Sequence, residues 1–62
     1  MKPHEIKALR LRLRESQQEF ADRLGLRTKG AVSLLESGRR KPKATLLQLL
    51  YLIEDTTILK KT

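Results

Sequence analysis

Apolar residues recur at helical spacing in four blocks along this chain of 62 residues, and turn-forming residues separate the blocks. The blocks cover residues 3–13, 16–25, 28–38 and 44–54. No repeat or linker divides them, and a chain of this length forms one domain at most. We therefore predict an all-α fold of four to five helices over residues 1–55, followed by an extended or frayed tail over residues 56–62.

The first block also carries a competing pattern, because leucine and arginine alternate over residues 9–14. Strict alternation is typical of a half-buried strand. Leucine and arginine both favour helix, however, and no β-branched run supports a strand. Ile6 also extends the helical stripe formed by Leu9 and Leu13. We predict a helix here, with the strand as the weaker alternative.

The second and third blocks have the start and stop signals of two short helices joined by a tight turn. Ser16 and Glu19 are three residues apart, as in a capping box at a helix N-terminus. Gly25 tolerates the positive φ that a tight turn needs, Thr28 suits the N-cap of the next helix, and Gly38 suits its end. Together these signals predict a helix-turn-helix arrangement.

The second of these two helices is predicted to expose a face of small and short side chains. On a helical wheel Val32 and Leu35 point inward. The residues expected to face outward are Lys29, Gly30, Ala31, Ser33 and Leu34. Such a face can enter a DNA major groove, which is about 12 Å wide, without steric conflict.

Positive charge is concentrated around this helix. Fourteen Lys and Arg against seven Asp and Glu give the chain a formal net charge of +7. Residues 27–43 hold one acid, Glu36, and six bases, which are Arg27, Lys29, Arg39, Arg40, Lys41 and Lys43. Nucleic acid is the commonest partner of so basic a small domain. A merely solvated basic surface is the alternative.

The composition argues against other classes of site. The chain has no Cys and one His, which excludes disulfides, a cysteine nucleophile and a multi-ligand zinc site within one chain. No paired carboxylates and no glycine-rich phosphate loop are found, so we predict no enzyme, no cofactor, no metal and no small-molecule substrate. The apolar stretch over residues 46–53 is too short to cross a membrane and no secretory signal is visible. We expect a cytoplasmic, nucleoid-associated protein.

The last block has more apolar residues than one helix face needs. One stripe should close the core and consists of Leu46, Leu49, Leu50 and Ile53. Leu47, Tyr51 and Leu52 lie outside this stripe and suggest a second buried surface. We predict a twofold homodimer through these three residues. A core thick enough to absorb them is the alternative.

Two segments carry a family resemblance, the runs over residues 17–25 and 32–42, and the most specific element is Glu36-Ser37-Gly38-Arg39-Arg40-Lys41-Pro42. The chain resembles the Cro/repressor-type (XRE-like) helix-turn-helix family, including its small antitoxin-like members, over residues 6–54. The resemblance implies a lambda-repressor-like fold and a transcriptional regulator that binds double-stranded DNA, most simply a repressor that binds a palindromic operator as a dimer. The recognition helix would be about residues 28–36. The alternative is an antitoxin-type module that mainly binds a toxin protein, with DNA autoregulation secondary.

The resemblance also implies roles for individual residues. Those implied to contact DNA are Gln17, Gln18, Arg27, Thr28, Lys29, Gly30, Ala31, Ser33, Leu34, Ser37, Arg39, Arg40 and Lys41. Arg10 and Glu36 match a partly buried structural ion pair. The spacing from Gly25 to Glu36 is one residue longer than is usual in the family. The turn therefore carries an extra residue within residues 26–29, which leaves the register of the base contacts open.

Overall fold

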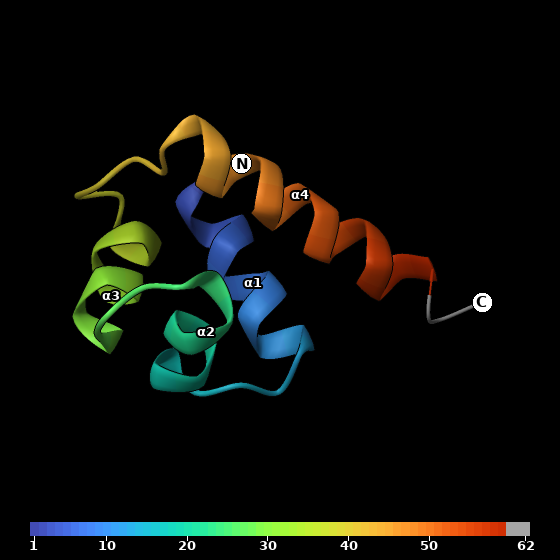
Figure 1. The fold of residues 1–62 in the computed structure, drawn as a ribbon, viewed down its shortest axis with the longest axis horizontal. Helices are drawn as coiled ribbons and strands as arrows, with labels where there is room; N and C mark the ends of the chain where they lie inside the picture. Colours follow the sequence, from blue (N-terminus) through green and yellow to red (C-terminus); the bar gives the residue numbers. More distant parts are fainter. Residues whose placement is uncertain (60–62) are drawn as a thin grey trace.

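The computed structural model describes residues 1–59 and contains four α-helices and no strand within that range (Figure 1). The helices are α1 (Pro3–Arg12), α2 (Gln17–Leu24), α3 (Lys29–Ser37) and α4 (Ala44–Leu59). α1 and α2 both pack on α3, and α4 packs on α2. The predicted all-α fold is confirmed. None of the helices in residues 1–59 is long and apolar enough to span a bilayer.

α1 resolves the competition between helix and strand in the first block. Pro3 occupies the first turn, and the Lys2 backbone N–H donates to Glu5 Oε1 over 2.6 Å. This hydrogen bond lowers the pKa of the Glu5 carboxyl. Ile6 and Leu9 are buried, whereas Leu11 is 57% exposed, so the buried positions follow the helical period. The strand alternative is wrong, because alternate burial would have required Leu11 to be inside.

α2 begins and ends as the sequence predicts. The Ser16 hydroxyl accepts from the Glu19 backbone N–H over 3.1 Å, and the Ser16 backbone N–H donates to Glu19 Oε1 over 2.8 Å. These two bonds complete the capping box, and the bond from the Ser16 backbone N–H to the carboxylate lowers the pKa of the Glu19 carboxyl. At the other end Gly25 has φ +75°, and the Leu26 N–H donates to the Ala21 carbonyl over 2.8 Å. The chain therefore leaves α2 through a Schellman turn.

The core forms where the four helices meet. Its buried members are Ile6, Leu9, Phe20, Ala21, Leu24, Val32, Leu35 and Leu50. Leu46, Leu49 and Ile53 of α4 are partly buried and pack against this cluster, so the predicted α4 stripe closes the core. Tyr51 and Leu52, which lie outside the stripe, are 45% and 62% exposed. The core therefore does not absorb all of the apolar side chains of α4.

The predicted tail is wrong for residues 56–59, because α4 continues to Leu59. The Thr56 hydroxyl donates to the Leu52 carbonyl over 2.9 Å, and the Thr57 hydroxyl donates to the Ile53 carbonyl over 2.8 Å. Propagation of a helix that is already nucleated costs little, so these β-branched residues continue it, and their hydroxyls bond to carbonyls of the preceding turn. The rest of the predicted tail, residues 60–62, lies outside the described residues.

The turn between α1 and α2 holds a non-glycine residue in the left-handed region. Arg14 has φ +58°. Its N–H donates to the Leu11 carbonyl over 3.0 Å, and the Glu15 N–H donates to the Arg10 carbonyl over 3.3 Å. This is the helix termination that normally uses glycine. Arg14 therefore carries local backbone strain that a glycine would relieve.

We predict that Arg14→Gly raises the free energy of unfolding by about 0.5–1 kcal/mol, because relief of left-handed strain exceeds the added entropy of the unfolded chain. Arg12→Gly is the matched control, since Arg12 is the last helical residue of α1. It should lower the free energy of unfolding by up to about 1 kcal/mol. Urea unfolding followed by circular dichroism measures both changes. A loss of stability in both variants would contradict the strain at Arg14.

Candidate nucleic-acid interface

α2 and α3 form a helix-turn-helix whose turn is residues 25–28. Thr28 is the N-cap of α3 and is extended, with φ −139° and ψ 156°, but its hydroxyl makes no capping hydrogen bond. α3 then runs without interruption from Lys29. α3 itself is a regular helix, and the place of the extra residue within residues 26–29 stays a prediction.

The outward face of α3 matches the helical-wheel prediction except at one residue. Val32 and Leu35 are buried, while Lys29, Gly30, Ser33 and Ser37 are exposed and Leu34 is 39% exposed. Ala31 was expected to face outward, but it is half-buried against the side of the turn. On a helical wheel it lies about 70° from the midpoint of Val32 and Leu35, which places it on the flank of the helix and not on its outer face.

The basic loop over residues 39–41 is fixed to the end of α3 by one carbonyl group. The Leu34 carbonyl accepts from the backbone N–H of Arg39 over 3.1 Å and from that of Arg40 over 3.2 Å. Gly38 makes this possible with φ +81°, at a site where a Cβ would lie 3.3 Å from Pro3 Cγ. The peptide groups of Arg39 and Arg40 are therefore held directly to the end of α3.

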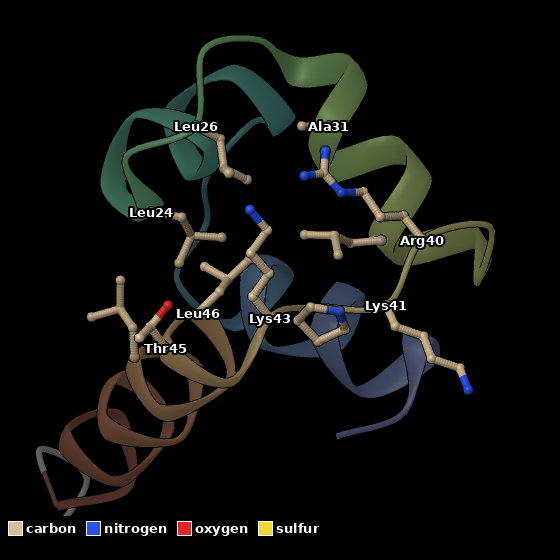
Figure 2. Close-up of a pocket in the computed structure, with 11 residues that line it drawn as sticks. Leu24, Leu26, Ala31, Arg40, Lys41, Lys43, Thr45 and Leu46 are labelled. Carbon is tan, nitrogen blue, oxygen red and sulfur yellow. The ribbon is translucent and has the colours of Figure 1, made fainter.

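The three cationic side chains of this loop do not point the same way. Arg39, Arg40 and Lys41 are all exposed. The Arg40 guanidinium reaches back toward Ala31, whereas Lys41 points away from the body of the protein (Figure 2). The loop thus presents positive charge both along α3 and outward from it.

Arg10 and Glu36 form the partly buried ion pair that the resemblance implies. Arg10 Nε donates to Glu36 Oε2 over 2.6 Å and Arg10 Nη2 donates to Glu36 Oε1 over 3.3 Å, with side-chain exposures of 11% and 6%. Gln17 Nε2 also donates to Glu36 Oε1, over 3.2 Å. Arg10 Nη1 donates to the Glu15 carbonyl over 3.0 Å. This network joins α1, the start of α2 and the end of α3.

The network uses part of the hydrogen-bonding capacity of the two glutamines at the start of α2. One N–H of the Gln17 amide is used on Glu36. A primary amide has two such donors, so the second remains for a ligand. Gln18 is exposed, and its amide donates to Asp22 Oδ1 over 3.1 Å. Gln17 is therefore held in place beside α3, while Gln18 is engaged along its own helix.

The charge around α3 is almost entirely positive. Between residues 23 and 53 Glu36 is the only acid, and Arg10 neutralises it from the inner side. Arg27, Lys29 and the loop cations are exposed around α3. Of the DNA-contact residues implied by the resemblance, all but Ala31 and the half-buried Gln17 are exposed at α3, its two flanking turns or the first turn of α2. A polyanion can approach this surface with no exposed acid on α3 to repel it.

A helix-turn-helix family model matches residues 6–50, from the middle of α1 to the middle of α4. The chain belongs to the Cro/repressor-type (XRE-like) helix-turn-helix family. This Cro/repressor-type protein is accordingly a DNA-binding transcription regulator. A search of curated proteins and a search of solved structures find no match to it.

The sequence pattern missed a second ion pair in this Cro/repressor-type protein. Arg23 Nε donates to both carboxylate oxygens of Glu15, over 2.9 and 3.0 Å. The hydrogen bonds to this carboxylate raise the pKa of the Arg23 guanidinium. The two residues are eight positions apart, with Glu15 in the turn that precedes α2 and Arg23 in the last turn of α2, so the pair does not belong to one helix. Among residues 1–59 no group of His, Asp and Glu is arranged to hold a metal ion.

We predict that Arg10→Met lowers the free energy of unfolding by about 3 kcal/mol, because it leaves the Glu36 carboxylate largely buried without its cation. The double variant Arg10→Met/Glu36→Leu removes both charges and should recover most of that loss. Urea unfolding of the wild type, the two single variants and the double variant gives the coupling energy. Strictly additive losses would show that the ion pair contributes no coupling.

Proposed function

We propose that this protein is a transcriptional repressor that inserts α3 into the major groove of a palindromic operator and binds it as a homodimer. The observation that carries the proposal is the outer face of α3. Gly30 and Ser33 are small, uncharged residues on this face, and exposed cations lie at both ends of the helix. Occupying a promoter is enough for repression, so no further domain is needed.

In this proposal, most of the affinity for the duplex comes from the cations that flank α3. Arg27 precedes the helix and Arg39 and Lys41 follow it, so phosphates on both sides of the groove can be reached. Contacts of this kind release counterions and give affinity without sequence preference. Gln17, oriented by Glu36, would add a neutral donor to a backbone phosphate from the start of α2.

Sequence preference has to come from the few side chains on α3 that can reach base edges. Lys29 can donate to guanine O6 and N7, Ser33 can bond to several bases, and Leu34 can contact a thymine methyl group. Each good base contact contributes about 1–3 kcal/mol of discrimination. Because these contacts are few, the deformability of the operator should supply part of the selectivity.

Selection of bound fragments from a random duplex library, read at two salt concentrations, tests the DNA proposal. A palindromic consensus is the expected result. Lys41→Gln should weaken binding to all sequences and reduce the salt slope by about 0.9. Lys29→Gln should relax the preference at one base position in each half-site. Lys7→Gln, an exposed charge change on α1, is the matched control. Equal retention of all duplexes would contradict sequence-specific regulation.

The exposed apolar side of α4 supports the dimer. Tyr51 and Leu52 are exposed and Leu47 is half-buried, in a chain whose own core is small. The Met1 ammonium donates to Tyr51 Oη over 2.8 Å, which satisfies the polar end of the tyrosine while its ring remains available for packing. A twofold dimer would place two copies of α3 about one turn of DNA apart, roughly 34 Å.

We predict that the wild type sediments as a dimer at micromolar concentration and that Leu52→Glu shifts it to the monomer, because the change places a charge in the interface. The same variant should lose affinity for the two-half-site operator but not for a single half-site. Leu11→Glu is the matched control, since Leu11 is similarly exposed on α1. A wild-type monomer of 7.2 kDa at these concentrations would contradict the dimer.

An antitoxin role is the second candidate, and the same exposed part of α4 favours it. Leu52 and Tyr51 could pack on a toxin protein instead of a second copy. Hydrogen exchange separates the two functions, because a protein partner should protect α4 whereas DNA should protect residues 29–41. An autonomous repressor should footprint its palindrome without any partner.

A further inference from the structure

A cavity of about 300 Å³ opens between the α2–α3 turn and the start of α4 (Figure 2). Its apolar lining comes from all three segments that surround it, with Leu24 and Leu26 at the turn, Ala31 and Leu35 on α3, and Leu46 and Leu49 on α4. Ala31, which was expected on the outer face of α3, lines this cavity instead. The size lies at the lower end of the range for small-molecule sites, so it suits a ligand and not a folded partner.

Two cations cover the mouth of this apolar cavity. The Arg40 guanidinium reaches over it toward Ala31, and the Lys43 ammonium extends toward Leu24 and Leu26, while Lys41 points away (Figure 2). No Asp or Glu lines the cavity. Neither Arg40 nor Lys43 forms an ion pair within the described part of the chain. The cavity therefore combines an apolar interior with unneutralised positive charge at its rim.

We propose that this cavity binds a small amphipathic carboxylate, whose hydrocarbon body packs on the leucines and whose head pairs with Arg40 and Lys43. An apolar molecule without charge would leave both cations without a partner. An inorganic anion would leave the leucines in contact with water. Only a ligand with both parts satisfies the whole lining, and the planar donor fork of a guanidinium is well suited to a carboxylate.

Such a ligand would regulate the protein, and this consequence rests on the proposed operator binding. Arg40 is also implied to contact the DNA backbone. A carboxylate that holds Arg40 over the cavity removes one cation from the phosphate surface, so the ligand and the operator should weaken each other's binding reciprocally. The protein would then release its operator when the carboxylate accumulates.

Titration of the intact protein with decanoate, without DNA, tests the site directly. Saturable methyl shifts at Ala31, Leu26 and Leu46 in NMR spectra are expected below about 1 mM. Arg40→Gln and Lys43→Gln should each weaken decanoate binding about threefold or more. Lys7→Gln removes the same charge from α1 and should leave it unchanged. Acetate and decanol, which each lack one part of the ligand, should bind at least about tenfold more weakly than decanoate.

Several outcomes would overturn the proposal. If decanol bound as tightly as decanoate, the cations would not contribute to binding. Equal decanoate affinity of the Arg40→Gln, Lys43→Gln and Lys7→Gln variants would lead to the same conclusion. Failure of decanoate to saturate, or shifts confined to other surfaces, would remove the site altogether. Operator displacement by decanoate is measured separately. Its absence alongside saturable binding would overturn the regulatory consequence and leave the site in place.

Discussion

The ion pair between Arg10 and Glu36 is the contact on which the arrangement of the first three helices depends. Its carboxylate receives two hydrogen bonds from α1 and one from the start of α2, although it belongs to the end of α3. A largely buried charge is tolerable only when such partners are all in place. The pair therefore couples the orientation of α3 to that of both other helices. The pair also neutralises Glu36, the one acid of α3, so that the exposed charge around α3 is positive.

The ends of the helices shape that surface as much as the core does. Gly25 and Gly38 both adopt left-handed conformations, so the chain reverses sharply before and after α3. These reversals bring Arg27 to one end of the helix and Arg39 to the other. Val32 and Leu35 supply the packing that leaves the opposite face empty of bulk. Short side chains outside and apolar packing inside therefore follow from the same helical pattern of α3, which suits the proposed entry into a groove.

Much of this could be predicted from the sequence, because the relevant signals are local. The capping box of Ser16 and Glu19, the glycines that end α2 and α3, and the helical period of Ile6 and Leu9 all involve neighbours within a few residues. The Arg10–Glu36 pair connects distant positions, and only the family resemblance implied it. The roles of individual residues in DNA contact stay predictions, since exposure alone does not assign them.

What the sequence did not predict depends on tertiary surroundings. Thr56 and Thr57 continue α4 although both are β-branched, because α4 is already nucleated by the residues that pack on the core. Ala31 lies on the flank of α3, where it lines the cavity beside the α2–α3 turn and α4. Arg14 adopts a left-handed conformation that is typical of glycine.

The single carbonyl of Leu34 has a mechanical consequence. Because it holds the peptide groups of Arg39 and Arg40, it ties the backbone at the start of the basic loop to the end of α3. In the proposed operator complex, a tilt of α3 in the groove would therefore shift the backbone of these two cations with it, and the fit to the bases would be coupled to the fit to the phosphates. The proposed repressor would then respond to the groove width of a duplex as well as to its base sequence.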